Sequence, residues 1–372
     1  MTDMADARLP RFKLDEADFL SQYWQQRPLL IRGALPDFIA PIDADTLAGL
    51  AMEDMIESRI VSFDQGSWAL AHGPFQAKDF ERDSPWTLLV QGVDQWLPEV
   101  AALRGCVDFL PAWRFDDVMV SYAVDGGSVG PHFDRYDVFL LQGEGQRLWR
   151  VGQYCDESTP RLEHDSLHLL ANFETVEEYV LNPGDALYIP PGYAHWGIAQ
   201  GECTTFSLGF RAPTLADLSD RLLESVVERL PPTLLLEDQD SITGHERPGE
   251  ISRRQIDNAR AAVINAANAL DDGVWLGALV SETKTPLDEL NMEPLAQQLV
   301  LDPAARVLWI EQAQCIEVFC GGESLSIDKS LLPSLLSLLG SASLLSESAS
   351  AELHQLLTFL WARGGLIDLE DL

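Results

Sequence analysis

Positive charge is scarce in this chain. Only 25 of its 372 residues are lysine or arginine, against 59 aspartates and glutamates, so the formal net charge is −34. This balance argues against a general nucleic-acid-binding surface, because binding to the phosphate backbone depends on clustered cations. An acidic surface favours association with a basic partner, but it can equally serve solubility alone, and composition does not separate the two.

Long apolar runs are missing too. No stretch is apolar for long enough to span a bilayer, and the leucine-rich segment 331–345 is interrupted by Pro333 and several serines. The first residues, Met1 to Ala7, lack the basic segment and apolar run of a signal peptide. The sequence therefore predicts a cytoplasmic protein without membrane segments.

Cysteine is sparse and its count is odd. The spacing of the five cysteines does not resemble a zinc knuckle, and an odd number cannot all pair within one chain. They are predicted to be reduced thiols, as in cytosolic proteins. They are Cys106, Cys155, Cys203, Cys315 and Cys320.

A hydrophobic content of 46% over 372 residues is sufficient for a large core and for more than one domain. In the first hundred residues the patterns predict helices at 15–25 and 45–55, and a hairpin of 59–63 with 67–70. Residues 86–96 are also predicted to be helical.

From residue 117 the pattern changes to short alternating strands separated by glycine turns. Strands are predicted at 118–124, 178–181, 186–189 and 204–210, and a hairpin of 137–142 with 147–151. Residues 153–175 are interpreted as an insertion. This spacing is typical of a small barrel or a double-sheet roll.

After Pro213 the spacing of apolar residues becomes that of amphipathic helices. Amphipathic segments at 215–230, 251–270 and 274–281 could bury their apolar faces between two subunits or within the chain. After Thr283 the order of predicted strands and helices is compatible with a winged-helix-like module. Without a basic face, that module is predicted to contact protein and not DNA.

Two histidines and one aspartate form the candidate metal site. His132 and Asp134 are two residues apart, so on a strand their side chains leave the same face. Pro190-Pro191-Gly192 is a rigid turn that places His195 at the start of another strand. Two imidazoles and one carboxylate form the facial triad of iron(II) oxygenases, which leaves positions open to co-substrate and O2. The alternative is a metal-free roll with ordinary surface histidines.

Arg147 is the candidate anion-binding residue. It shares strand parity with Trp149 and Val151, so an inward-facing strand would place a permanent cation near the metal, preorganised for a carboxylate. The alternative is an outward surface arginine, which is the role expected for Arg150.

Seven stretches together resemble the JmjC-type, cupin-fold 2-oxoglutarate-dependent oxygenases, and among these the bacterial ribosomal oxygenases. The resemblance covers most of the chain, and the combination is far more specific than His-x-Asp alone. The stretches are Tyr23–Pro28, His72–Phe75, Gly130–Phe139, Arg147–Gly152, Pro183–Asp185, Tyr188–Gly192 and Ser207–Pro213.

The resemblance implies the site residues and the ligands. Iron(II) would be held by His132, Asp134 and His195, and 2-oxoglutarate would chelate it and extend its distal carboxylate to Arg147. Ser121 matches a second co-substrate contact, although a strand hydroxyl bonded to backbone is an equal alternative. Weaker candidates are Thr205 and Ser207 as further contacts, and Tyr136 as a border of the substrate groove or a packing residue.

The resemblance also implies the architecture. We expect a mainly β fold with helices. Its first part, residues 1–213, would be a JmjC-type double-stranded β-helix (cupin or jelly roll) with an N-terminal α/β extension and its core at about 100–213. A helical dimerisation region at 214–283 and a winged-helix-like domain at 284–372 would follow, and the protein would be a homodimer.

The implied activity is hydroxylation of the β-carbon of an arginine in a basic large-subunit ribosomal protein, with O2 consumed and succinate and CO2 released. Carboxylates near the site would attract the target guanidinium, but most of the four nearby acids are expected to be solvated. These acids are Asp116, Asp117, Asp125 and Asp137. Alternatives are a hydroxylase of histidine or of another protein, a lysine demethylase, or a non-catalytic cupin that senses a ligand.

Overall fold

A computed structural model describes residues 11–164, 166–242, 244, 246–282, 293–340, 343–346 and 349–371 of the chain. It contains two compact units, Met1–Ala212 and Pro213–Leu372, and each is considered by itself. The expectation about Met1 to Ala7 and the predicted domain boundary at 283/284 lie outside the described residues.

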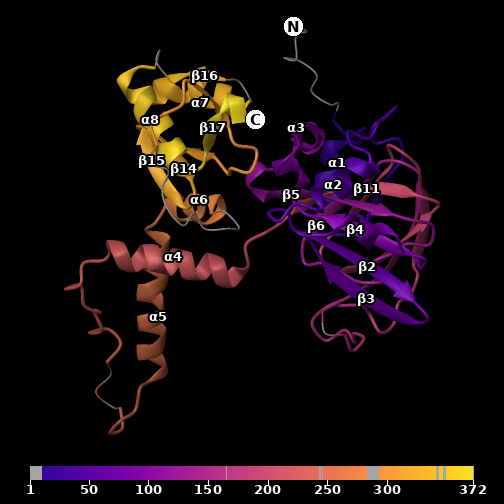
Figure 1. The fold of residues 1–372 in the computed structure, drawn as a ribbon. Helices are drawn as coiled ribbons and strands as arrows, with labels where there is room; N and C mark the ends of the chain where they lie inside the picture. The colour runs from indigo at the N-terminus through magenta and orange to yellow at the C-terminus, as the bar shows by residue number, and fades with distance from the viewer. Residues whose placement is uncertain are drawn as a thin grey trace. The chain divides into compact units, whose positions relative to one another are not determined.

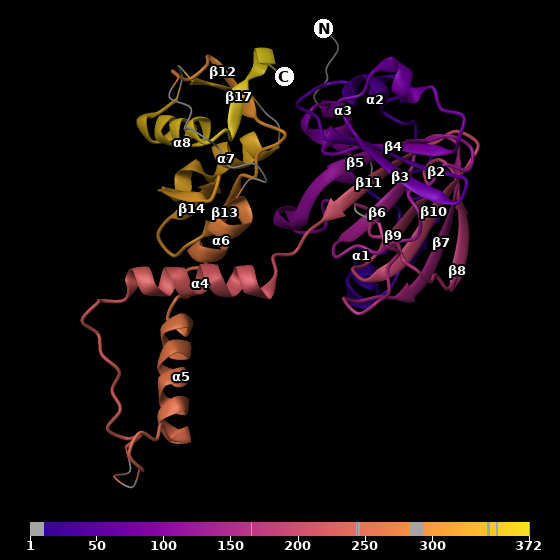
Figure 2. The same ribbon diagram turned by 60° about the horizontal axis from the view of Figure 1, so that its bottom comes forward.

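The first unit is built on two antiparallel sheets (Figure 1). The larger has the strand order β1-β9-β6-β11-β5-β4-β2-β3, and the smaller has the order β10-β7-β8. Figure 2 shows β10, β7 and β8 side by side. The strands are β1 (Leu29–Ile31), β2 (Ser58–Asp64), β3 (Ser67–His72), β4 (Trp86–Val90), β5 (Phe115–Ala123), β6 (Asp137–Gln142), β7 (Gln146–Tyr154), β8 (Glu177–Leu181), β9 (Ala186–Ile189), β10 (Tyr193–Gln200) and β11 (Cys203–Phe210).

The inner faces of these two sheets pack against each other. One buried cluster joins Val138, Leu140 and Leu187 of the larger sheet to Trp149 and Val151 of the smaller sheet. Along β7, buried residues alternate with more exposed ones, as expected for a strand with one face in the interior. The predicted JmjC-type double-stranded β-helix is confirmed.

Short helices cover the outer face of the larger sheet: α1 (Glu16–Gln22), α2 (Ala44–Leu50) and α3 (Pro98–Ala101). Aspartates begin the first two, because Asp15 and Asp43 accept hydrogen bonds from backbone N–H groups of the first turn. Phe19 of α1 is buried against the rings of Phe139 and Tyr188. The N-terminal extension is thus part of the main core.

The structure corrects two predictions of secondary structure. Residues 86–96 are not a helix: Trp86–Val90 is β4, buried along its whole length between β2 and β5. A strand buried on both faces shows no alternation in sequence, so periodicity could not identify it. The predicted hairpin of 137–142 with 147–151 is also wrong, because β6 pairs with β9 and β11, whereas β7 pairs with β8 and β10. Consecutive strands here cross between the two sheets.

The second unit contains five helices among the described residues, together with two three-stranded sheets, β16-β12-β17 and β13-β14-β15. The helix α6 packs on the second sheet, where Gly277 contacts the ring of Phe319 so closely that a Cβ would lie 2.4 Å from it. The elements are α4 (Leu215–Arg229), α5 (Arg253–Asn268), α6 (Val274–Ser281), β12 (Gln298–Leu301), β13 (Leu308–Glu311), β14 (Ile316–Cys320), β15 (Glu323–Ile327), α7 (Leu332–Leu339), β16 (Leu344–Leu345), α8 (Ala351–Ala362) and β17 (Leu366–Asp368).

The division into residues 1–213, 214–283 and 284–372 stays a prediction, as does the winged-helix-like character of the last part. In the portion of the chain that the structure describes, no helix combines the length and the apolar character needed to cross a bilayer. All five cysteines are unpaired.

Candidate active site

The structure brings His132, Asp134 and His195 together. One ligand atom from each lies within 4.8 Å of the others, and no other group of three potential ligands among the described residues does so. Oδ2 of Asp134 is 3.8 Å from Nε2 of His132 and 3.5 Å from Nε2 of His195. With metal–ligand bonds of roughly 2.1 Å, two donors on one ion can be at most about 4.2 Å apart. Both distances meet this limit.

Two glycine turns position the triad. His132 follows Gly130, at φ +82°, where a Cβ would lie 2.7 Å from Leu169. Gly192, at φ +84°, donates its backbone N–H to the carbonyl of Asp134 at 2.8 Å. Both conformations are in the left-handed region that favours glycine. The Pro-Pro-Gly turn therefore holds the segment of His195 directly against the segment of Asp134.

Hydrogen bonds orient both imidazoles for metal binding. Nδ1 of His132 lies 2.9 Å from the carbonyl of Gly130, and Nδ1 of His195 lies 3.0 Å from the carbonyl of Tyr193. A carbonyl can only accept, so each Nδ1 carries the proton and each Nε2 presents its lone pair toward Asp134. The donor set therefore fits a divalent ion such as iron(II).

The charge states also suit a metal. Burial, with the neighbouring His195, lowers the pKa of His132 to about 4. Burial raises the pKa of Asp134, but the interactions with the neighbouring imidazoles of His195 and His132 outweigh this and lower the pKa to about 2. At neutral pH His132 is neutral and Asp134 is ionised, so neither has to lose a proton to bind an ion.

Arg147 faces the barrel interior, as its parity predicted. Its side chain is 5% exposed, and its Nη1 donates to Oγ of Ser121 at 3.3 Å. Its Nε and Nη2 have no acceptor among the described residues. Arg150, three residues further along β7, points outward and pairs with Glu178 at 2.7 Å. A buried guanidinium with free donors is matched to an anion from outside the chain.

The three serine and threonine candidates are buried on the larger sheet, and one of them, Ser121, contacts Arg147. Oγ of Ser121 also donates to the backbone carbonyl of Thr205 at 3.5 Å, which is the alternative expected for a strand hydroxyl. Its role as a co-substrate contact stays a prediction. Thr205 is buried and donates to Oε1 of Gln142, and Ser207 is buried two residues further along β11.

Tyr136 lies beside the triad. Burial and the carboxylate of Asp134 raise its pKa, and Asp117 adds to the effect. Tyr136 therefore belongs to the surroundings of the metal site, and Asp117 is a second carboxylate that acts on Tyr136.

The expectation that most nearby acids are solvated is wrong. Asp137 is 0% exposed, Asp117 is 4% exposed, and the Asp116 side chain is paired with Arg211 at 2.6 Å. Only Asp125 is exposed, and it accepts a hydrogen bond from the backbone of Gly201. Strand parity places Asp117 on the same face of β5 as Ser121, whereas Asp137 shares the opposite face of the larger sheet with Phe139 and Leu141. Loop composition alone does not indicate either position.

The sequence did not reveal a buried polar network around Asp137, at the start of β6. Asp137 accepts from Arg114 at 2.9 Å, from Tyr188 at 2.5 Å and from Gln25 at 3.3 Å. The backbone N–H of Gln25 in turn donates to the hydroxyl of Tyr188 at 2.7 Å. The polar residues of the Tyr23–Pro28 stretch could have indicated this network, because polar side chains beside buried aromatic residues need hydrogen-bond partners.

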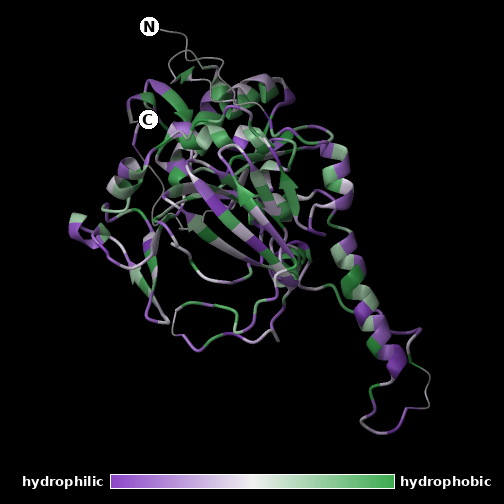
Figure 3. Ribbon diagram, turned by 90° about the vertical axis from the view of Figure 1, so that its right-hand side faces the viewer, coloured by the Kyte–Doolittle hydropathy of each residue, from purple (hydrophilic) through white to green (hydrophobic). Residues whose placement is uncertain are grey.

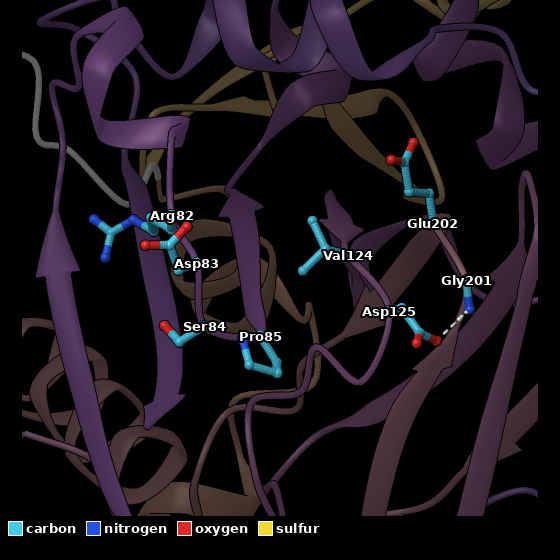
Figure 4. A pocket seen from close by; sticks show the side chains of 8 residues that line it. All are labelled: Arg82, Asp83, Ser84, Pro85, Val124, Asp125, Gly201 and Glu202. Carbon is cyan, nitrogen blue, oxygen red and sulfur yellow. Dashed lines mark hydrogen bonds between the residues drawn. The ribbon is translucent and has the colours of Figure 1, made fainter. Parts of the chain in front are cut away.

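A separate pocket of about 430 Å³ opens where residues 82–85, 124–125 and 201–202 meet (Figure 4). The figure shows the hydrogen bond from the backbone of Gly201 to Asp125 at its rim. No member of the triad and no proposed co-substrate contact lines it. It is therefore distinct from the candidate active site.

Comparison with known proteins agrees with this geometry. A family model of the JmjC domain matches residues 102–218. The chain is 38% identical over 282 residues to the ribosomal protein uL16 3-hydroxylase of Escherichia coli, covering 76% of this chain and 75% of that protein. It is 42% identical over 216 residues to a probable ribosomal oxygenase of Haemophilus influenzae, covering 57% of this chain and 54% of that one.

Solved structures extend the similarity to almost the whole chain. The Escherichia coli ribosomal oxygenase YcfD, in complex with cobalt and 2-oxoglutarate, matches with a TM-score of 0.79 and 32% identity. The match covers 96% of this chain and 99% of that structure. The chain therefore belongs to the JmjC-domain ribosomal oxygenases.

Proposed function

We propose that this protein is an iron(II)- and 2-oxoglutarate-dependent hydroxylase that acts on the β-carbon of an arginine in a large-subunit ribosomal protein. The observation that carries this proposal is the joint placement of the triad and a buried, partly unpartnered Arg147 in one barrel interior. The relative in Escherichia coli is named a 3-hydroxylase of uL16, which makes uL16 the first substrate to test.

The bound iron would supply the chemistry that couples O2 and 2-oxoglutarate to insertion of one oxygen into a C–H bond, with succinate and CO2 as the other products. His132, Asp134 and His195 would hold the ion on one side and leave its other positions open. No acid–base pair has to be found among the side chains, because the protein's task is to bind, orient and exclude side reactions.

Arg147 and Ser121 would bind the far carboxylate of 2-oxoglutarate. Nε and Nη2 of Arg147 are the donors that remain, since Nη1 is occupied by Oγ of Ser121. Two parallel N–H groups match the two oxygens of a carboxylate. Ser121 would orient the guanidinium by accepting from Nη1, and its hydroxyl hydrogen would turn from the Thr205 carbonyl to the co-substrate.

Asp117 and Tyr136 would receive the target arginine. The carboxylates of Asp134 and Asp117 both raise the pKa of Tyr136. Asp117 is buried on the inner side of β5. Its carboxylate could pair with a guanidinium, while the Tyr136 ring offers a surface on which a cation can stack. The net charge of −34 would favour the approach of a basic ribosomal protein. Such a substrate places the reaction in the cytoplasm.

A homodimer through α4 and α5 is the proposed assembly. Both helices expose large apolar residues, among them Val227 at 71% and Val263 at 53%. In Figure 3 hydrophobic and hydrophilic residues alternate along α5. Exposed apolar faces of this extent mark interaction surfaces. Light scattering of Val227→Asp/Val263→Asp protein should give half the mass of the wild type.

The test of the function is mass spectrometry of ribosomal proteins after incubation with the enzyme, iron(II), 2-oxoglutarate and O2. The expected result is a gain of one oxygen on an arginine of uL16. A gain on a histidine would select the alternative target, whereas unmodified ribosomal proteins with continued succinate formation would refute the substrate but retain the chemistry. Protein carrying Asp134→Ala should give neither product.

A further inference from the structure

Trp149 carries a buried hydrogen-bond donor that the described residues leave without an acceptor. Its side chain on β7 is 4% exposed, and nothing in the described part of the chain accepts from its Nε1. By contrast, Nε1 of Trp196 on β10 donates to Oγ of Ser128 at 2.9 Å. A buried indole N–H ordinarily has a partner, so the acceptor for Trp149 is expected from outside the chain.

Arg147 presents two more such donors on the same wall. It lies two residues before Trp149 on β7, and both side chains are buried on the inner face. Its Nε and Nη2 also lack acceptors, and its guanidinium carbon is 5.8 Å from the centre of the Trp149 ring. The three unpartnered N–H groups call for a ligand with several oxygen atoms.

The strand register places Trp149 between Arg147 and the metal ligands. Across the β7–β10 pair, Val151 faces His195, Trp149 faces Gly197, and Arg147 faces Ala199. The Trp149 ring is 6.0 Å from the imidazole of His195. A ligand that reaches from the triad to Arg147 therefore passes the indole.

Gly197 makes room for the indole at this position. A Cβ on Gly197 would lie 2.8 Å from two carbons of the Trp149 ring, which is closer than real Cβ contacts. The ring therefore rests against the backbone of β10, and its place on the barrel wall depends on this glycine.

We propose that Trp149 binds the co-substrate, and that its indole N–H donates a hydrogen bond to an oxygen of the 2-oxoglutarate held by Arg147. The inference rests on the proposed function, since it takes 2-oxoglutarate as the ligand of Arg147. The indole N–H of Trp149 would be a further hydrogen-bond donor to the co-substrate, located between the metal and the guanidinium of Arg147.

The first test observes the indole directly in the wild-type protein. With 15N-labelled tryptophan and zinc(II) in place of iron, the Trp149 indole resonance can be assigned through its contact with Gly197. Titration with 2-oxoglutarate should move this resonance downfield, while zinc(II) alone should not. If 2-oxoglutarate binds and the resonance stays in place, the proposal is overturned. If the wild-type protein binds no 2-oxoglutarate, both this inference and the proposed function fail.

The second test uses Trp149→Phe with Trp196→Phe as the matched control. Trp149→Phe should weaken 2-oxoglutarate binding roughly tenfold, the effect of one lost hydrogen bond, and should leave zinc(II) affinity unchanged. Its melting temperature without ligand should fall only by what the smaller ring costs in packing, since the lost N–H has no partner among the described residues. Trp196→Phe should show the reverse, a lower melting temperature with unchanged 2-oxoglutarate affinity. A stability loss in Trp149→Phe without a change in affinity would assign Trp149 a structural role only.

Discussion

His132, in the segment before β6, and His195, on β10, are direct backbone partners. The N–H of each donates to the carbonyl of the other, at 3.1 Å and 2.8 Å, and their rings are 4.3 Å apart. Two metal ligands distant in sequence are thereby held at one position by a pair of hydrogen bonds that involve no side chain. The site is therefore preformed, because its geometry is part of the strand pairing.

Loss of one triad side chain should abolish metal binding without unfolding the barrel. We expect His132→Ala protein, studied anaerobically with iron(II) and 2-oxoglutarate, to lack the metal-to-ligand charge-transfer band of the wild type. The exposed His168, changed to Ala, is the matched control and should retain the band. A band that persists in His132→Ala would refute the triad assignment.

Arg147→Ala should weaken 2-oxoglutarate binding at least tenfold, because charge-assisted hydrogen bonds contribute about 1.5–3 kcal/mol. Metal affinity should be unchanged. Arg150→Ala is the control, since its guanidinium pairs with Glu178 on the outer face. Calorimetric titration measures both affinities, and equal 2-oxoglutarate affinity in wild type and Arg147→Ala would contradict the role of Arg147.

Asp117→Asn should raise the KM for an arginine-containing substrate peptide about tenfold or more, because the amide keeps the size but loses the charge that pairs with a guanidinium. Succinate formation without peptide should be unaffected. Asp125→Asn, at an exposed acid nearby in sequence, should leave KM unchanged. An unaltered KM in Asp117→Asn would remove this residue from the substrate site.

Arg114→Ala should destabilise the protein by about 3–5 kcal/mol, because it leaves the fully buried carboxylate of Asp137 without its cation. Arg135→Ala removes an exposed partner of Glu157 and should cost less than about 1 kcal/mol. Urea unfolding measures both changes. Equal losses of unfolding free energy in the two variants would show that the buried Arg114–Asp137 pair contributes no more stability than an exposed ion pair.

The metal-free protein should lose stability as the pH falls from about 6.5 to 4. Unfolded His132 takes up a proton near its usual pKa of 6.5, whereas in the folded chain its pKa is about 4. In this window the unfolded state binds more protons, so acid favours unfolding, by up to roughly 3 kcal/mol at pH 4. Above pH 6.5 His132 contributes no pH dependence.

The effect of His132 is separable from that of Asp134. The pKa of Asp134 is lowered to about 2 from 3.8, so its stabilising contribution is lost only below pH 3.8. Melting curves of His132→Gln in the presence of a chelator should show a shallower slope between pH 6.5 and 4. An identical slope in the wild type and the variant would contradict the low pKa of His132.

Local pattern was a good guide wherever one face of an element is buried. Alternation along residues 147–151 predicted that Arg147 points inward and Arg150 outward, and both do. It failed for Trp86–Val90, where burial on both faces removes the alternation, and for β6 and β7, where a hairpin-like turn joins strands of different sheets. Turn composition reports a reversal of the chain but not which strand the chain then pairs with.

The sequence by itself determined the residue types of the site and their local spacing: His-x-Asp before a strand, a Pro-Pro-Gly turn before His195, and an arginine at inward parity. Only the tertiary structure decided that the two histidines pair through their backbones and that Asp117 and Asp137 are buried. It also decided that two donors of Arg147, beside Ser121, have no acceptor among the described residues. The reason is physical. Parity and turns are set by neighbours along the chain, whereas burial and hydrogen-bond partners are set by strands that sequence order does not bring together.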